Sequence, residues 1–201
     1  MTHVFPYLCV LSLDDDDPYL ASYFDLFERE SCVKIVNQIN KGCCEAINRA
    51  AQYMNIYKGD LIVVISDDLI PFAGWDNKLL EFIDQNITKD EFLIHISDGH
   101  GFRDDCALIP IMSGALYQKL GYVFYPEYIS QFADNDLWNV CHRLGAVYPF
   151  RDFAFFHNHP DFGGSLPLDD TYRHSNSSDK IALGRKIWER RCTENFGFPN
   201  A

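Results

Sequence analysis

Short apolar runs alternate with segments of helical spacing along the first half of the chain. The runs are continuous or rich in β-branched residues, which is typical of buried strands. The predicted strands are 7–13, 32–39, 61–65 and 92–96. The helices predicted between them are 18–30, 42–53 and 75–85. This alternation predicts an α/β fold with a mostly parallel central sheet flanked by helices.

The second half of the chain is less regular, but apolar residues still recur at helical spacing in three places. The predicted helices are 113–120, 134–144 and 179–193, with a short strand at 153–156. Residues 161–180 are rich in Gly, Pro, Ser and Asp, which favours a loop. No repeat or linker divides the sequence, so we expect residues 1–201 to form one domain.

Charge and cysteine content exclude several classes of protein. The net charge is −12, whereas a nucleic-acid-binding surface needs clustered Lys and Arg. No apolar run approaches the roughly 18 to 20 residues that span a bilayer, and the N-terminus has no basic signal region. The seven cysteines contain no C-x-x-C pair, which indicates free thiols in a reducing compartment. We therefore expect a cytoplasmic protein without a transmembrane segment.

Carboxylates follow two of the predicted strands. Asp14 to Asp17 end the first strand, and Ser66-Asp67-Asp68 follow the strand at 61–65. Parallel strands place their carboxyl ends along one edge of a sheet, so both groups are expected at one site. Oxygen ligands suit Mn²⁺ or Mg²⁺, which can bridge a diphosphate. The alternative is that these residues form ordinary polar turns, with Asp16 or Asp17 capping a helix.

Two further groups could take part in chemistry. His157 and His159 lie two residues apart after an apolar strand, so their imidazoles share one side, and one of them could join carboxylates around Mn²⁺. Asp134 and Asp136 begin a predicted helix, where either could cap it or act as a general base.

The order of these features resembles the GT-A glycosyltransferases, in particular their large inverting family. Residues 11–18 resemble the second strand of that family and its nucleotide-binding aspartate. Asn40-Lys41-Gly42 with residues 46–50 resembles the N-x-G…A-x-N-x-[GA] helix. The most specific match is residues 59–75, which resemble the family's GD…DxD…P…W block. The match spans about residues 8 to 160.

The resemblance implies a metal-dependent transfer of a sugar from a nucleotide-diphosphate sugar to a hydroxyl acceptor on a glycan, lipid or protein. Asp68 with His157 or His159 would hold Mn²⁺ or Mg²⁺, and Asp134 or Asp136 would be the base. The nucleotide sugar would contact Asp14, Asp16, Asn40, Ser66 and Asp67.

The sequence departs from the family pattern in four places. Ser66 stands where the first Asp of the metal motif is usual, and Ala133 replaces a Glu before the base. No Q-x-x-R-W motif is present, which argues against a processive synthase. The family's first strand is expected before residue 7 and is absent, and the open sheet edge would favour a homodimer. Two alternatives therefore stay open: a non-catalytic GT-A remnant that binds a nucleotide or a partner, and a related nucleotidyltransferase or hydrolase.

Overall fold

A computed structural model gives the arrangement of the chain and describes residues 7–27, 33–159, 164, 173 and 176–199. The strands are β1 Cys9–Asp14, β2 Val33–Gln38, β3 Leu61–Val63, β4 Leu69–Ile70, β5 Leu93–Ser97, β6 Ile111–Ser113, β7 Val147–Ala154 and β8 Phe156–His157. The helices are α1 Leu20–Phe27, α2 Cys43–Tyr53, α3 Trp75–Asn86, α4 Gly114–Leu120, α5 Ala133–Arg143 and α7 Ser178–Thr193, with a 3-10 turn η2 at Asn195–Gly197. The predicted loop at 161–180 lies largely outside the described residues.

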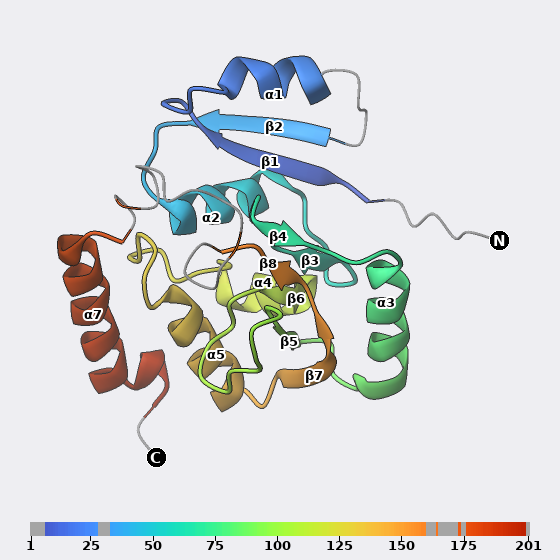
Figure 1. The fold of residues 1–201 in the computed structure, drawn as a ribbon. Helices are drawn as coiled ribbons and strands as arrows, with labels where there is room; N and C mark the ends of the chain where they lie inside the picture. The colour runs from blue at the N-terminus through green and yellow to red at the C-terminus, as the bar shows by residue number, and fades with distance from the viewer. Residues whose placement is uncertain (1–6, 28–32, 160–163, 165–172, 174–175, 200–201) are drawn as a thin grey trace.

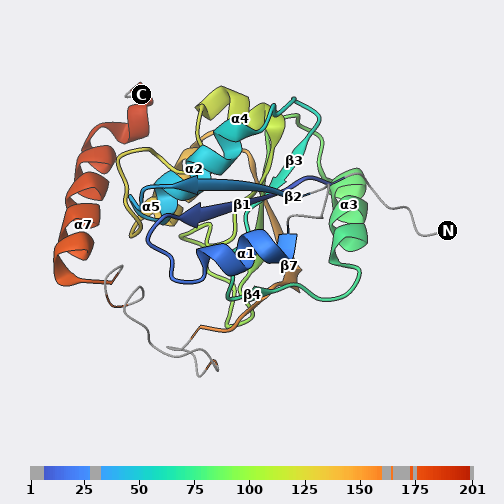
Figure 2. The same ribbon diagram turned by 90° about the horizontal axis from the view of Figure 1, so that it is seen from above.

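The strands form three sheets (Figures 1 and 2). β1 and β2 pair in parallel and lie between α1 and α2 in both views. The central sheet has the order β3-β6-β5-β7, with α3 at one side and α5 and α7 at the other. β4 and β8 form a separate antiparallel ribbon. The molecule is therefore a mixed α/β fold with a central sheet flanked by helices.

The central sheet is mixed. β3, β5 and β7 run in one direction, and the short β6 is inserted antiparallel to both β3 and β5. β6 has three residues and precedes α4 directly, so its strand character depends on its neighbours and not on its own sequence. Ser113, which the sequence pattern assigns to the following helix, is the last residue of this strand.

The two middle strands of the central sheet, β5 and β6, are buried on both faces, which explains why they are mostly apolar. Leu93 and Met112 are paired across β5 and β6 and face the core formed with α2, α4 and α5. Ile94 and Ile111 are the next pair and face the opposite core, which contains Leu79 of α3. All four strand residues are completely buried. Burying each such side chain stabilises the fold by about 1.5–3 kcal/mol.

Two residues of the N-x-G…A-x-N pattern have structural roles. Gly42 has φ +96°, and a Cβ there would lie 2.6 Å from the Ile129 carbonyl oxygen, so only glycine fits before α2. Asn48 is buried and its Oδ1 accepts hydrogen bonds from the backbone N–H groups of Val123 and Phe124. Its Nδ2 donates to the Phe124 carbonyl at 2.7 Å. α2 is thereby fixed to the segment that leads into α5.

Candidate active site

The β4–β8 ribbon brings together the two parts of the sequence that are predicted to hold a metal. Leu69 pairs with His157 across the ribbon, and the Asn158 N–H donates to the Asp68 carbonyl at 2.8 Å. These backbone contacts place His157 Nε2 2.8 Å from Asp68 Oδ2. The two residues are 89 positions apart, so their contact is created entirely by the fold.

Asp68 is held as a carboxylate. Partial burial alone would raise its pKa, but hydrogen bonds from Ser66 and His157 outweigh the burial and hold the pKa below its usual value. Ser66 Oγ donates to Oδ1, while Oδ2 faces the His157 ring. Ser66, which replaces an aspartate of the family pattern, therefore orients the next carboxylate of the motif.

The second histidine lies two residues beyond the first, past the end of β8. The His157 and His159 rings are 4.9 Å apart in an edge-to-face arrangement. Both side chains are half-buried. His157, which pairs within the ribbon, is therefore the member of the pair that the ribbon presents to Asp68.

Asp68 and His157 provide one oxygen and one nitrogen donor at one point. A mixed oxygen and imidazole set suits Mn²⁺. Within the described part of the chain, no group of three or more His, Cys, Asp or Glu side chains could by itself hold a metal. A cation here would thus have two protein ligands and complete its shell with phosphate oxygens and water, as substrate-bound cations commonly do. The residues fit a metal that binds together with a diphosphate.

Asp98 is a member of this site that the sequence does not single out. It follows β5, it is only 5 % exposed, and its Oδ2 lies 3.9 Å from His157 Nδ1. Its carbonyl accepts the His157 N–H at 2.9 Å. The signal in the sequence is another aspartate at a strand end, in Ser97-Asp98-Gly99-His100, a pattern that by itself favours a turn.

The aspartates after β1 form a second part of the site. Asn40 Nδ2 lies 3.3 and 3.4 Å from the two Asp16 oxygens, so two of the predicted nucleotide ligands meet. Burial and the neighbouring carboxylates raise the pKa of Asp14, and among the described residues its buried Oδ1 has no hydrogen-bond partner. Such an acceptor is costly unless a ligand donates to it.

Asp67, the middle residue of Ser66-Asp67-Asp68, differs from Asp68 in its exposure to solvent. It is exposed in the turn before β4, whereas its partner in the motif, Asp68, is half-buried. The pKa of Tyr23 in α1 is raised by burial and by the negative charges of both Asp17 and Asp67. Asp17 and Asp67 therefore both lie within electrostatic range of Tyr23.

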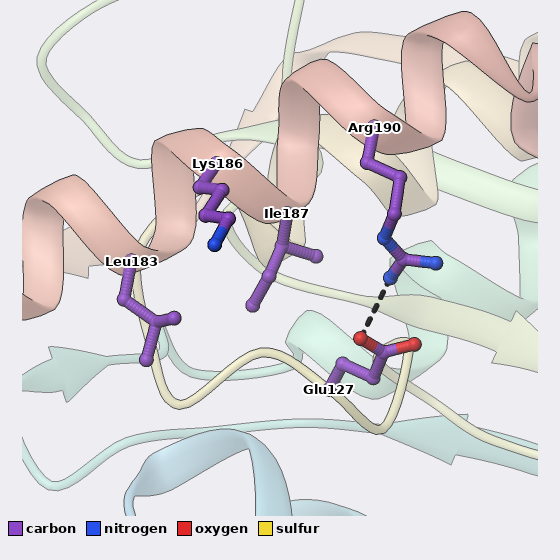
Figure 3. Close-up of a pocket in the computed structure, with 5 residues that line it drawn as sticks. All are labelled: Glu127, Leu183, Lys186, Ile187 and Arg190. Carbon is purple, nitrogen blue, oxygen red and sulfur yellow. Dashed lines mark hydrogen bonds and ion pairs between the residues drawn. The ribbon is translucent and has the colours of Figure 1, made fainter.

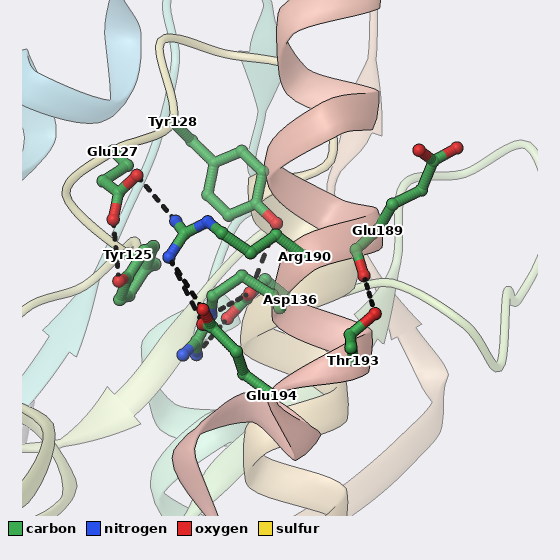
Figure 4. A network of polar contacts seen from close by, with 9 residues as sticks. Tyr125, Glu127, Tyr128, Asp136, Glu189, Arg190, Thr193 and Glu194 are labelled. Carbon is green, nitrogen blue, oxygen red and sulfur yellow. Dashed lines mark hydrogen bonds and ion pairs between the residues drawn. The ribbon is translucent and has the colours of Figure 1, made fainter.

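The two candidate bases in α5 have different environments. Asp136 is completely buried and forms a bidentate ion pair with Arg191 of α7, with distances of 2.8 and 3.1 Å. It also accepts a hydrogen bond from Tyr128 (Figure 4). Asp136 is thus fully engaged in joining α5 to α7. Its place in the apolar stripe of Ala133, Leu137 and Val140 is the sequence signal for this burial.

Asp134 has none of these partners. Burial raises its pKa, and the nearby Arg103 guanidinium opposes that rise. Its charge also raises the pKa of Cys44, which places it near the start of α2. A partly buried carboxylate with a raised pKa is a better proton acceptor than an exposed one. Between the two candidates, the geometry favours Asp134.

An open hollow of about 410 Å³ lies elsewhere on the molecule (Figure 3). It is lined by Glu127, Leu183, Lys186, Ile187 and Arg190. Arg190 spans it to Glu127 with a 2.6 Å ion pair. None of the predicted site residues lines this hollow, and we assign it no part in the chemistry.

Comparison with known proteins gives a structural match only. No protein-family description matches the sequence, and no curated protein matches it. Among solved structures, S. aureus TarS is 14% identical with a TM-score of 0.58, over 97% of this chain and 39% of TarS. This chain has the GT-A glycosyltransferase fold. The catalytic domain of Drosophila beta1,4galactosyltransferase 7, solved with xylobiose, is also similar, at 13% identity and a TM-score of 0.49, over 89% of this chain and 79% of that domain.

The similarity to TarS covers nearly all of this chain but only part of TarS. The chain spans about 39% of the length of TarS. None of the described helices has the length and apolar character required to cross a bilayer. The resemblance found in the sequence is thereby confirmed at the level of the fold.

Proposed function

We propose that this GT-A domain transfers a sugar from a nucleotide-diphosphate sugar to a hydroxyl acceptor, with inversion at the anomeric carbon. The contact between Asp68 and His157 carries the proposal. It joins a carboxylate and an imidazole from two distant segments at the edge where ligands bind in α/β sheets.

Asp68 and His157 would hold Mn²⁺ or Mg²⁺ together with the diphosphate. When bound, the cation supplies positive charge that stabilises the diphosphate as it leaves. Ser66 orients Asp68 through its hydroxyl. His159 is the neighbouring imidazole and would contact the diphosphate side of the site.

The nucleotide-sugar would lie along the carboxylates between β1 and β4. Asp14 offers an unpaired buried oxygen to an N–H or O–H donor of the nucleotide. Asp16 and Asn40, which contact each other, would line this region together with Asp67. Hydrogen-bond donors on a base and ribose match these acceptors.

Asp134 would act as the general base. The acceptor oxygen attacks the anomeric carbon, the bond from that carbon to the diphosphate oxygen breaks, and the acceptor proton passes to Asp134. Direct displacement of this kind inverts the anomeric configuration. Asp136 would have no part in the step, because Arg191 and Tyr128 occupy its oxygens.

The proposal is tested by calorimetric titration of UDP and GDP into the protein with and without Mn²⁺. We expect one of the two nucleotides to bind only with the metal, and Asp68→Asn to abolish this binding. Asp84→Asn is the control, because Asp84 is an exposed carboxylate on α3. Metal-independent binding, or normal binding to Asp68→Asn, would contradict the assignment.

A donor-sugar screen then separates transfer from its alternatives. Product in which the sugar is joined to an acceptor hydroxyl supports transfer. Free sugar that forms equally with and without acceptor would indicate a hydrolase, and nucleoside monophosphate would indicate a nucleotidyltransferase. Metal-dependent binding with no turnover would indicate a non-catalytic GT-A protein.

A further inference from the structure

The residue that precedes α5 has an unusual backbone. Phe132 has φ +71° and ψ 0°, in the left-handed region that side chains with a Cβ rarely adopt. It occupies the N-cap position without a side-chain cap hydrogen bond, whereas Ser, Thr, Asp or Asn in an extended conformation is usual there. The local sequence therefore does not fix the start of α5, and Phe132 must be held in this conformation by its surroundings.

Helix α7 supplies these surroundings. The rings of Phe132 and Trp188 are stacked with their centroids 6.4 Å apart, and the Arg185 guanidinium lies 5.6 Å from the Phe132 ring. Gly184 lets the two segments approach closely, because a Cβ there would lie 2.6 Å from the Gln131 carbonyl oxygen and 3.1 Å from the Phe132 ring. Residues 131 and 132 are thus held against one face of α7.

Trp188 also contacts a second aromatic residue with a left-handed backbone. Phe196 in η2 has φ +54°, and its ring centroid is 5.4 Å from that of Trp188. Among the described residues, the only other non-glycine residue with positive φ is Asn195, which directly precedes Phe196. All of the left-handed non-glycine backbone that the structure describes therefore lies against α7 or directly after it.

Phe132 lies two positions before the proposed base. Its carbonyl accepts the Asp136 N–H at 3.0 Å, which is the first hydrogen bond of α5. Burial raises the pKa of Asp134, and hydrogen bonds from the backbone N–H groups of Asn135 and Asp134 oppose that rise. The backbone of this first turn therefore both directs the Asp134 carboxylate and favours its charged form.

We propose that Phe132 is a positioning residue for Asp134, and that a brace formed by Gly184, Arg185 and Trp188 of α7 holds it in the left-handed conformation from which α5 starts. This inference rests on the proposed function for the role of Asp134. Released from the brace, residue 132 would relax to an extended or right-handed backbone, and the first turn of α5 would change its path. Asp134 would then move although no residue that touches the substrate had been altered.

Charged and titratable side chains also face Asp134 from segments outside α7. The loop after β5 and the start of α2 contribute these groups, which are Arg103, Asp105, Cys106, Cys43 and Cys44. A variant in α7 leaves all of them in place. A change in the titration of Asp134 in such a variant therefore reports a change in the position of its carboxylate.

Gly184→Ala tests the brace without altering Phe132, Asp134 or any residue of the proposed site. The added methyl group must push residues 131 and 132 away from α7, so the first turn of α5 should lose its alignment. We expect kcat to fall by about 10- to 100-fold, the usual effect of a misplaced catalytic group, with nucleotide affinity unchanged. Ala182→Gly weakens the same helix at an exposed position and should change neither quantity.

A second readout needs neither metal nor substrate. An NMR titration of the Asp134 carboxyl carbon, assigned with Asp134→Asn, should give a higher pKa in Gly184→Ala than in the unaltered protein, because the N–H groups of the first turn no longer face the carboxylate. Phe132→Ala should show the same rise. Glycine adopts the left-handed conformation without steric cost, so Phe132→Gly should show a smaller rise and unfold at a higher temperature than Phe132→Ala.

The outcomes separate the brace from the function. An unchanged or lower pKa of Asp134 in Gly184→Ala, or equal effects of Gly184→Ala and Ala182→Gly, would overturn the brace even if sugar transfer is intact. If the pKa rises as expected but the unaltered protein transfers no sugar, Phe132 still positions Asp134 and the proposed function fails. If Phe132→Ala unfolds at the same temperature as Phe132→Gly or above it, the backbone at residue 132 is not strained, which would also overturn the brace.

Discussion

At the scale of single residues, burial separates two aspartates that the sequence presents as equals. Asp134 and Asp136 lie in the same first turn of α5. The side chain of Asp136 points into the interface with α7, while Asp134 faces the start of α2 and the loop that carries Arg103. The same helix therefore supplies one carboxylate for stability and one for the proposed chemistry.

Replacing Asp134 should separate turnover from binding. We expect Asp134→Asn to lower kcat by about 10²- to 10⁴-fold, the usual contribution of a general base, with little change in nucleotide affinity. The measurement is steady-state kinetics beside calorimetry on the same preparation. Asp105→Asn, a neighbouring exposed carboxylate, serves as the control. Equal loss of activity in both variants would argue against a specific role for Asp134.

The same substitution should stabilise the protein at neutral pH. Burial raises the pKa of Asp134, so the folded state holds the proton to a higher pH than the unfolded state does. Stability from this group is therefore present at low pH and is lost as the pH rises through the folded-state pKa. Asn carries no charge, so Asp134→Asn should unfold at a higher temperature than the unaltered protein at about pH 7. The melting temperatures of the two proteins should converge in acid, below the unfolded-state pKa of about 3.9. A difference that persists there would show that the buried charge of Asp134 is not the cause.

Arg103 should set the acidic limit of activity. A base works only when deprotonated, so kcat/KM should rise with pH through the pKa of Asp134. The Arg103 guanidinium lowers that pKa, and Arg103→Gln should therefore move the acidic limb of the pH profile upward. Arg151→Gln, at an arginine that pairs with Asp104, should leave the profile in place.

At the scale of helices and strands, two glycines show how close packing restricts the chain. Gly114 begins α4, and a Cβ there would lie 1.9 Å from the Tyr57 carbonyl oxygen. Gly114→Ala should lower the free energy of unfolding by about 1–3 kcal/mol, because backbone must shift to admit the methyl group. In the part of the chain that the structure describes, no atom lies within 4 Å of the equivalent position at Gly59, so Gly59→Ala should change stability much less. Urea denaturation of the pair measures the difference.

Two neighbouring arginines of α7, one buried and one exposed, should differ in their contribution to stability. Arg191→Met should destabilise the fold by about 3–5 kcal/mol, because it leaves Asp136 charged and buried without a partner. Arg190→Met removes an exposed arginine from the next position, and its effect should be far smaller. The double variant Asp136→Asn with Arg191→Met carries no buried charge and should recover part of the lost stability. If it does not, the unpaired charge of Asp136 is not the cause of the destabilisation.

Periodicity predicts the long helices well, whereas the eight-residue strand β7 is predicted only at its end, as part of 153–156. α2, α3, α5 and α7 begin and end within about two residues of the sequence prediction, because each carries an apolar stripe over several turns. β4, β6 and β8 are missed as strands or placed wrongly, since two or three residues have no period of their own. Their pairing is decided by distant partners, as between Leu69 and His157.

Candidate site residues can be proposed from the sequence, but their arrangement cannot. Strand-end position indicates Asp14, Asp67 and Asp68, since that position is a local property of the sequence. The choice of His157 over His159 for contact with Asp68 depends on the register of the β4–β8 ribbon. Asp98 cannot be predicted as a site residue from the sequence, because its side chain approaches His157 only when β8 lies beside the turn that follows β5.

At the scale of the whole molecule, metal and nucleotide should stabilise the fold together. Nucleotide at about 100 times its dissociation constant adds about 2.7 kcal/mol to the free energy of unfolding, which raises the melting temperature by about 5 to 11 °C for a chain of this size. Removing Mn²⁺ with EDTA should abolish the shift. Thermal unfolding with each component alone is the control, and a full shift from nucleotide without metal would contradict metal-dependent binding.

The buried contacts between α5 and α7 have a consequence for cutting the chain. α7 and η2 contact α5 through Asp136, Arg191 and the apolar surface around Ile187. A peptide of residues 176–199 should therefore rejoin a protein that ends at residue 159, and a chain nicked between these pieces should still migrate as one particle. The last helix could then carry a label or half of a split reporter into the folded domain.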